Sequence, residues 1–444
     1  MLEGITIAVS GDAILNRRVS VLKDERFLSL VKLIRSVDVA YTHLEYVIHD
    51  YDGPEVYPAA EAGYSWARSP RFVLDELKWI GFDIVSQASN HGLDYMYGGL
   101  LSTIKALDEA GIPHAGTGIN LGEARQPAYL DTEKGRVALV SMCSSVYSWA
   151  RAGDARRDIK GRPGVNPLRF YYTVDKDTLK TMIDLYTRLG WWVQQVEHEW
   201  LFNPAGLHMA VSRFVESDEP GLHTRVDEED ADGNLRAIQE AKRQADWVLV
   251  NVHNHEWDPE KGLSAPPEFI PPFARACIDA GADIFIGQGS HAFIRGIEIY
   301  KGKPIFYDPG DLFFMINNVS KQPSDLYFRA GFRHDVRDWR CTPTDAYEAK
   351  AAVPKALNPS GAYGFFNNNP GCFLPICSLD STGKLSELKL HPFTLVHKPL
   401  PRAGVPLLIT DQAAAKGLVE YMAGLSAPFG TKIEFKDGIG IVKL

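Results

Sequence analysis

The sequence predicts an α/β fold, and three observations lead to this prediction. Short runs rich in Ile and Val recur along the 444-residue chain, as expected of strands buried on both faces. Helix-like segments lie between these runs, and several of them end at a glycine just before the next run. Polar side chains follow directly after the runs. Such alternation is typical of sheets covered by helices.

The predicted elements alternate from the N-terminus onward. The predicted strands span residues 5–9, 37–41, 84–86, 137–140, 248–252, 284–286 and 305–307. The predicted helices span residues 23–36, 69–80, 98–110 and 267–280. Ser69 and Pro70 are typical of a helix N-terminus, where Ser caps the first turn and Pro loses no hydrogen bond. Gly81, Gly111 and Gly281 are typical of helix C-termini.

Two stretches interrupt this alternation. Residues 144–240 contain a Pro- and Arg-rich loop and a helical segment around 175–190, and residues 320–370 are rich in Pro, Asn and Arg. We interpret both as excursions over the core of a single domain that spans residues 1–444. The tail after residue 405 is compact and ends in alternating, strand-like residues.

Composition limits the classes of function. Hydrophobic residues make up 45% of the chain and charged residues 23%, which is typical of a globular protein. A net charge of −9 argues against a general nucleic-acid binder. The five cysteines are an odd number and widely spread, which favours a reducing compartment over a disulfide framework. With neither a signal-type stretch nor a membrane-spanning run, the sequence predicts a cytoplasmic protein. Its oligomeric state stays open.

Candidate metal ligands follow the carboxyl ends of five predicted strands. They are Asp12, Glu45, His91, the pair His253 and His255, and His291. Open α/β sheets bind ligands at this edge, so one mechanism accounts for all five positions. Taken singly, each residue has an ordinary alternative as a turn, cap or surface residue. We interpret the remaining histidines, His43 among them, as structural or surface residues.

The spacing of His253 and His255 makes the metal hypothesis sharper. Residues two apart in an extended segment point to the same side, so both rings can reach one metal. Glu256 then faces away or supports a neighbouring histidine. Nitrogen and carboxylate ligands together favour Mn, Zn or Fe. The sequence therefore predicts a divalent metal cofactor of one or two ions.

At these residues the chain resembles the CapA family, which is named for poly-γ-glutamate capsule biosynthesis and is related to calcineurin-like metallophosphoesterases. The similar blocks include Ser10-Gly11-Asp12, Leu44-Glu45, residues 89–94, residues 279–283, residues 297–307 and residues 425–431. The resemblance implies a metallophosphatase-like αββα sandwich. It also implies that Asp12, Glu45, Asn90, His91, His253 and His291 occupy the family's motif positions.

The chain departs from the family pattern at four places. His43 replaces an Asn, Gln288 replaces a His, residues 253–256 read His-Asn-His-Glu instead of a His-Trp-Gly block, and residues 308–311 read Asp-Pro-Gly-Asp instead of Ser-Leu-Gly-Asn. One ligand is lost at residue 288. New candidates arise at His43, His255, Asp308 and Asp311. These changes predict a rearranged site.

The leading hypothesis is metal-dependent hydrolysis of an amide, ester or phosphoester bond in an acidic small-molecule or oligomeric substrate, for example a γ-glutamyl compound. Asn90 would orient the substrate, and Glu256 or Asp311 would move protons. Arg162 and Arg169 flank a stiff loop and would hold an anionic group, unless this loop is simply solvated. The alternative is a non-hydrolytic accessory protein of poly-γ-glutamate synthesis or export, with a vestigial site.

Overall fold

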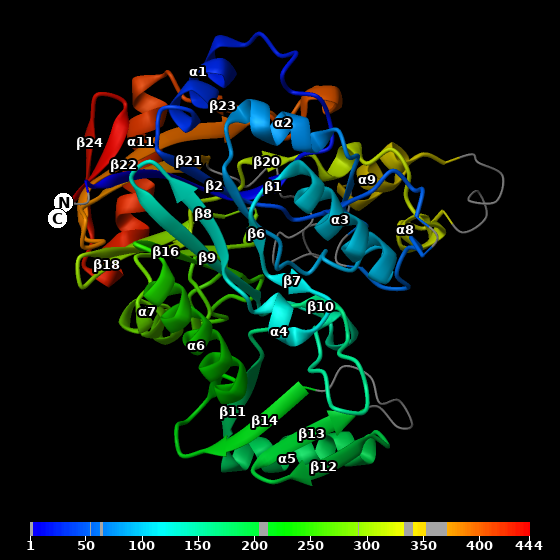
Figure 1. Cartoon of the computed structure of the whole chain (residues 1–444). Helices are drawn as coiled ribbons and strands as arrows, with labels where there is room; N and C mark the ends of the chain where they lie inside the picture. Colours follow the sequence, from blue (N-terminus) through cyan, green and yellow to red (C-terminus); the bar gives the residue numbers. More distant parts are fainter. Residues whose placement is uncertain are drawn as a thin grey trace.

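Two β-sheets packed face to face form the centre of the molecule, and helices cover their outer surfaces (Figure 1). This computed structural model describes residues 3–53, 55–62, 65–203, 212–291, 293–332, 341–351 and 371–444. Predicted segments within 333–340 and 352–370 lie outside the described residues.

The first sheet has ten strands. In spatial order its main path is β24 (Lys432–Lys436), β25 (Ile439–Lys443), β22 (Leu385–Leu395), β21 (Cys372–Leu379), β1 (Ile5–Ile14), β2 (Val39–His43), β5 (Ile84–Ser86) and β6 (His114–Ala115). Short strands β20 (Phe313–Phe314) and β23 (Pro406–Leu408) pair with β1 and β22. Because β1, β2, β5 and β6 are parallel, their carboxyl ends lie at one edge.

The second sheet has six strands. Their order is β18 (Arg295–Tyr300), β19 (Lys303–Asp308), β17 (Ile284–Gln288), β16 (Trp247–His253), β9 (Gly135–Cys143) and β8 (Ala128–Thr132). The four inner strands are parallel, and β18 and β8 are antiparallel edges. This sheet therefore also gathers its strand ends at one edge.

Helices complete a four-layer αββα arrangement, which confirms the predicted fold class (Figure 1). On the first sheet lie α1 (Glu25–Ile34), α2 (Val73–Ile80) and α3 (Met96–Ala110), and on the second lie α6 (Glu228–Gln244) and α7 (Ile270–Ala280). Within the described residues the other α-helices are α4 (Leu121–Ala124), α5 (Lys176–Arg188), α8 (Ser324–Arg329), α9 (Pro343–Ala351) and α11 (Gln412–Ser426).

Alternate side chains of the central strands enter two different apolar cores. Ile7 and Val9 of β1 lie between the sheets, whereas Ala8 packs towards the helices on the outer face. Leu249 and Val250 of β16 alternate in the same way between the intersheet core and the helix-covered core. Burial on both faces explains why these strands are continuous apolar runs in the sequence.

Every predicted strand and helix has a counterpart, with one error in a helix start. Gly81 and Gly111 end α2 and α3 in the left-handed conformation that glycine adopts readily. The predicted cap at Ser69 is wrong, because Ser69 lies in β4 (Arg68–Ser69), which pairs with β3 (Val47–Ile48). Its hydroxyl donates to the Leu15 carbonyl instead, 2.6 Å away.

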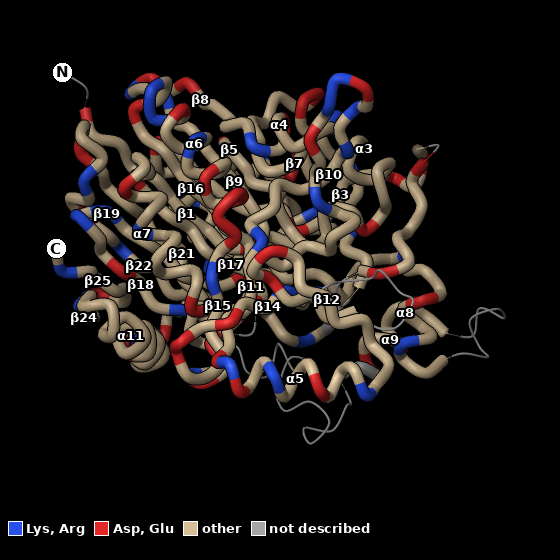
Figure 2. The backbone as a smooth tube through the Cα atoms, turned by 90° about the horizontal axis from the view of Figure 1, so that it is seen from below, with Lys and Arg blue, Asp and Glu red and all other residues tan. Residues whose placement is uncertain are grey.

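The predicted excursion at 144–240 contains a sheet of its own, which we call the insert (residues 170–226). Its strands are β12 (Trp192–Val196), β13 (Glu199–Asn203), β14 (Ser212–Ser217), β11 (Phe170–Asp175) and β15 (Leu222–Val226), in that order. Leu179 packs α5 onto this sheet, while acidic and basic residues alternate along the exposed side of α5 (Figure 2). The chain enters and leaves the insert at one place, because the Asp227 N–H donates to the Arg169 carbonyl at 2.8 Å.

Two further segments border the insert and the sheets. The strand pair β7 (Thr117–Gly118) and β10 (Gly164–Val165) precedes the insert, and α6 returns the chain to the second sheet, so the excursion ends before residue 240. The second predicted excursion begins with α8 and includes α9. Within the described ranges, no helix is both long and apolar enough to cross a membrane.

Candidate metal centre

The carboxyl ends of β1, β2, β5, β16 and β17 bring polar side chains from distant parts of the sequence together. Three sets each place three potential ligand atoms within 4.8 Å of one another. The sets are Asp12, His43 and His253; Glu45, His255 and His291; and Asp12, His291 and Asp311. All but His255 are buried. The structure thus brings together the acidic and imidazole side chains that the strand ends predict.

An irregularity in β1 places Asp12. The register with β2 shifts between Val9 and Asp12, so β1 has one more residue than β2 over this stretch. Gly11 lies against the Gly310 carbonyl, and a Cβ at residue 11 would lie only 2.2 Å from that oxygen. Only glycine fits this close approach, which holds Asp12 beside the loop that carries Asp311.

Glu45 lies at the centre of the cluster. Its Oε1 atom is 3.3 Å from Nε2 of His291, 3.6 Å from Nε2 of His253, and 3.7 Å from Nε2 of both His91 and His255. These separations are too long for strong hydrogen bonds, but they are typical of ligand atoms arranged around a common cation.

His253 and His255 converge as their spacing predicts. Their Nε2 atoms are 3.1 Å apart, and Asn90 Oδ1 lies 3.0 Å from Nε2 of His253. The other nitrogen of His253, Nδ1, is 3.4 Å from Asp12 Oδ1. The Ser145 hydroxyl accepts the His255 backbone N–H at 2.6 Å and so anchors the segment. Asn90 therefore lies next to the cluster.

His43 also belongs to the cluster. Its sequence context predicted a structural or surface residue, whereas the departure from the family pattern predicted a candidate ligand. Its ring stacks on His253 with centroids 5.0 Å apart, and its Nε2 is 3.8 Å from Asp12 Oδ1. Its Nδ1 lies 2.7 Å from Ser86 Oγ, which fixes the ring. The signal was available, because His43 and Glu45 have the same two-residue spacing as His253 and His255.

Two further histidines each have a carboxylate next to one ring nitrogen. Nδ1 of His91 is 2.5 Å from Asp94, and Nδ1 of His291 is 3.0 Å from Asp311. A carboxylate at one ring nitrogen orients the other towards a metal and makes it more basic. His291 adopts φ of +52°, a left-handed conformation that is costly for a residue with a Cβ. Its position therefore depends on the surrounding contacts.

Several buried ligand atoms lack hydrogen bonds, and these atoms indicate whether the site suits a cation. Among the described residues no hydrogen bond reaches either oxygen of Asp12, Oε2 of Glu45, Nε2 of His43 or Nδ1 of His253. An unpaired buried carboxylate is costly unless a cation neutralises it. Imidazole and carboxylate donors suit a borderline divalent cation. The donor set and its unsatisfied atoms therefore fit a divalent metal.

The two acidic groups respond differently to the cluster. Burial, followed by the charge of Glu45, raises the pKa of Asp12 well above its ordinary value. Burial also acts to raise the pKa of Glu45, but His291 and His253 hold it well below its ordinary value. Carboxylates and imidazoles are thus buried together in this cluster, and a divalent cation would neutralise the acidic groups.

Three of the histidines are neutral around pH 7. Burial lowers the pKa of His253 to about 3, and it lowers the pKa values of His43 and His255 well below the ordinary value. A neutral imidazole has the free lone pair that a metal ligand requires. For His291 burial acts in the same direction, but Glu45 and Asp311 raise its pKa. Burial raises the pKa of Asp311 to about 6.

Glu256 lies behind His255. The hydroxyls of Ser144 and Ser145 donate to its carboxylate at 2.6 and 2.8 Å, and burial raises its pKa. Arg295, fully buried, donates to the Asn254 side chain and to the Glu256 carbonyl, both at 2.6 Å. Arg295 and the two serines fix the segment that carries the paired histidines. Sequence reasoning missed these contacts, because the serines follow β9 and Arg295 begins β18, both far from Glu256 in the sequence.

The two arginines predicted to bind substrate make their hydrogen bonds elsewhere. The Arg162 guanidinium donates to the Arg151 carbonyl at 2.9 Å. Arg169 donates to both carboxylate oxygens of Asp230, at 2.7 and 3.0 Å, and to Glu229 at 3.1 Å. These acidic residues occupy the first turn of α6. Substrate binding by Arg162 and Arg169 stays a prediction, and the ion pairs of Arg169 favour a structural role.

Asp308 and Gln288 shape the surroundings of the cluster. The backbone N–H groups of Ser290 and Gly310 donate to the Asp308 carboxylate at 2.9 and 2.8 Å, which closes the turn before His291. Gln288 is fully buried at the end of β17 and pairs in register with His253. A neutral amide therefore occupies the strand position beside a central histidine.

Comparison with known proteins identifies the family. The model of the family described as "Bacterial capsule synthesis protein PGA_cap" matches residues 6–315, a range that includes every side chain of the cluster. The chain belongs to the PGA_cap family. The CapA resemblance predicted from the sequence motifs is thereby confirmed, and it connects the protein to bacterial capsule synthesis.

The similarity to three relatives covers different shares of each chain. The uncharacterized protein y4sH of Sinorhizobium fredii is 31% identical over 458 residues, covering 100% of this chain and 94% of the relative. Capsule biosynthesis protein CapA of Bacillus anthracis is 23% identical, covering 70% of this chain and 60% of the relative. A probable polyglutamine synthesis accessory protein of Mycobacterium tuberculosis is 28% identical, with 59% and 51% covered.

Proposed function

We propose that the protein is a metal-dependent hydrolase with a centre for two divalent ions, of the Mn, Zn or Fe class. One observation carries this proposal: two sets of ligands that share no residue lie side by side. Asp12, His43 and His253 form one set, and Glu45, His255 and His291 form the other. His91 lies against Glu45 at 3.7 Å. Such a pair of adjacent sets is what hydrolases with two ions require.

Divalent ions at these sets would lower the pKa of water and polarise the bond under attack. The chain itself contributes the orientation. The Asn90 amide, beside His253, is placed to donate to a substrate oxygen, and Asp94 and Asp311 hold two histidine rings. Asp311, with a pKa of about 6, is poised to exchange a proton near neutral pH. Glu256 is a second proton-transfer candidate, although both of its oxygens accept hydrogen bonds from serines.

The proposed substrate is an acidic molecule with an amide, ester or phosphoester bond, for example a γ-glutamyl compound. Support comes from the capsule-related family and from the names of the relatives, which refer to capsule biosynthesis and polyglutamine synthesis. The decisive experiment measures metal content and then hydrolysis of γ-glutamyl amides, carboxylic esters and phosphoesters, with Mn and Zn supplied separately. Stoichiometric metal with turnover that Asp12→Asn abolishes supports the proposal. Metal-free protein without turnover would overturn it.

A non-hydrolytic accessory role is the second candidate, because one relative is named an accessory protein and a neutral Gln288 lies beside His253. In this role the cluster would be vestigial. Metal content separates the two functions, since an accessory module needs no stoichiometric metal. Capsule-polymer binding with a low metal content and no hydrolysis would favour the accessory role.

A further inference from the structure

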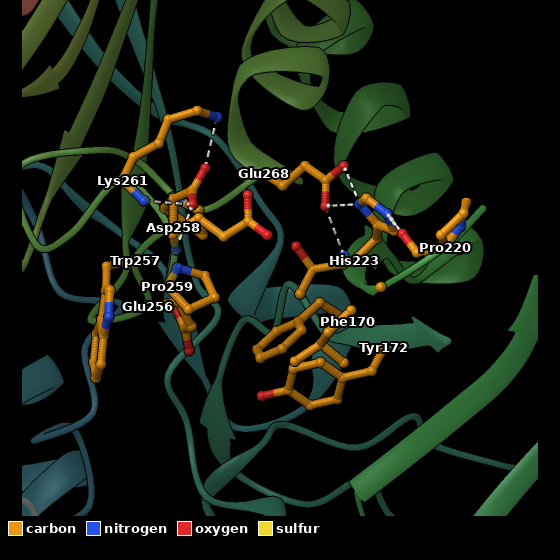
Figure 3. A pocket seen from close by; sticks show the side chains of 15 residues that line it. Phe170, Tyr172, Pro220, His223, Glu256, Trp257, Asp258, Pro259, Lys261 and Glu268 are labelled. Carbon is orange, nitrogen blue, oxygen red and sulfur yellow. Dashed lines mark hydrogen bonds and ion pairs between the residues drawn. The ribbon is translucent and has the colours of Figure 1, made fainter. Parts of the chain in front are cut away.

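A cavity of about 390 Å³ lies between the insert and the segment that follows His255. Residues 256–261 and 267–268 supply one part of its wall, and the insert supplies Phe170, Tyr172 and residues 220–224. Figure 3 shows Glu256 and Trp257 on one side and Phe170 and Tyr172 on the other. Its volume is in the range of small-molecule sites.

Aromatic rings in fixed positions form the apolar part of this wall. Phe170 stacks on Phe269 with ring centroids 4.8 Å apart, and Tyr172 stacks on Phe214 at 5.1 Å. These contacts support the two rings from the core and from the insert. Trp257 remains 43% exposed, although large aromatic side chains are usually well covered. The rings are therefore available to a ligand without rearrangement.

The charged part of the wall is acidic. Its carboxylates are Glu256, Asp258, Glu260 and Glu268, and its basic groups are Lys261 and His223. Both basic groups are already paired: Lys261 lies 2.7 Å from Asp258, and Nδ1 of His223 lies 3.1 Å from Glu268.

Glu260 leaves the cavity with excess negative charge. Its side chain is exposed, and within the described part of the chain its carboxylate forms no hydrogen bond or ion pair. A cation is therefore the complementary ligand, and an anion would meet repulsion.

We propose that this cavity binds an organic ammonium group, held over the faces of Phe170, Tyr172 and Trp257 and neutralised by Glu260. An ammonium ion is attracted to the negative face of an aromatic ring, and a nearby carboxylate adds a direct charge interaction. The alkyl part of the ligand would cover the rings. None of the proposed metal ligands lines this cavity, although the proton-transfer candidate Glu256 does, and the inference holds whether or not the proposed hydrolysis is correct.

Three probes with four carbon atoms each test the charge preference. Binding of butylamine, 1-butanol and butyrate to the purified full-length protein is measured by calorimetry at pH 7, where butylamine carries a positive charge. We expect butylamine to bind about ten-fold or more tightly than 1-butanol, and butyrate to bind most weakly. Equal or tighter binding of butyrate, or no binding of butylamine, would overturn the inference.

Variants locate the binding site. Glu260→Gln and Trp257→Ala change exposed side chains, and each should weaken butylamine binding by about three-fold or more. Glu133→Gln, in the turn between β8 and β9, removes an exposed carboxylate elsewhere and serves as the matched control. Metal content should be the same in all three variants, which separates this site from the metal centre. Unchanged butylamine affinity in both cavity variants would place the ligand elsewhere.

Discussion

At the scale of single residues, pairs of potential ligands two positions apart in the sequence determine which side chains make up the centre. His43 with Glu45, and His253 with His255, each leave a strand end with both side chains directed to the same side. Because the two strands belong to different sheets, the four side chains meet from opposite directions. Substitution of any one ring should therefore remove a ligand without disturbing either sheet.

Replacement of His43, His253 or His255 by Ala is expected to lower metal affinity on the order of ten-fold or more, with the fold retained. The reason is that each substitution removes one nitrogen ligand from a set of three potential ligands. Metal content per chain and circular dichroism, measured after dialysis, check this. His198→Ala, at an exposed turn of the insert, is the control. A variant that keeps full metal occupancy and full activity shows that its histidine is not a ligand.

Gln288 predicts poor general phosphatase activity. An amide oxygen is a weaker ligand than imidazole for a borderline metal, and Asp311 adds a negative charge that repels a phosphate dianion. Gln288→His should raise kcat/KM on aryl phosphate monoesters and diesters, on the order of ten-fold.

Gln288→Leu is the matched control for this prediction, because it removes the amide without adding a ligand. A γ-glutamyl amide and a carboxylic ester are assayed beside the phosphates, with Mn and Zn separately. Efficient turnover of phosphates alone by the natural protein would contradict the prediction. An equal gain in Gln288→Leu would show that imidazole is not the cause.

At the scale of elements, the junction between the insert and α6 depends on one carboxylate. Asp227 caps α6 by accepting the Asp230 N–H at 3.0 Å, and it pairs with Arg213 at 2.7 Å. Burial acts to raise the pKa of Asp227, but the Asp230 N–H and Arg213 outweigh burial and lower it. A carboxylate with a lowered pKa stabilises the fold above its unfolded-state pKa of about 3.9.

Asp227→Ala is therefore expected to lower the free energy of unfolding by about 1–2 kcal/mol at pH 7. The difference from the natural protein should shrink as the pH falls from about 4 through the lowered pKa, because Asp227 is then protonated in both states. Urea unfolding at several pH values measures this. Asp227→Asn keeps the cap but removes the charge, so it should retain part of the stability at all pH values. A difference that grows at low pH would contradict the assignment.

The elements that sequence reasoning found are those buried on both faces. Residues 84–86, for example, coincide with β5, because a fully covered strand must be continuously apolar. The insert was not predicted as a sheet, since strands such as β12 are mostly exposed and lack the continuous apolar run of a strand that is buried on both faces. Ser69 was misplaced because its hydroxyl bonds to a residue 54 positions away in sequence.

The candidate site was predicted in part for the same kind of reason. Strand-end positions such as Asp12 and His291 can be found from local sequence. The support of the site cannot, because Arg295 reaches Asn254 only after β18 has joined the sheet edge. The place of His43 in the site follows from local sequence as well, because His43 and Glu45 have the same two-residue spacing as His253 and His255.

At the scale of the whole molecule, the stability of the two packed sheets should depend on a cation at the proposed metal centre. Removal of divalent metal by a chelator is expected to lower Tm by roughly 5 °C, because the carboxylates of Asp12 and Glu45 then remain buried without a counter-ion. Differential scanning calorimetry with and without added Mn or Zn measures this. In Glu45→Gln the gap between the two conditions should narrow. Identical Tm values in a protein that holds stoichiometric metal would contradict the expectation.

The hydrogen bond between the Asp227 N–H and the Arg169 carbonyl has a consequence for how such proteins diversify. A segment whose two ends touch can be exchanged for another without rethreading the scaffold, as in tolerated domain insertions. Here the exchangeable module supplies Phe170, Tyr172 and residues 220–224 to the cavity, whereas the strand ends supply the metal ligands. Evolution or a protein engineer can thus change the ligand of this cavity by exchanging the module, while the proposed metal ligands at the strand ends stay in place.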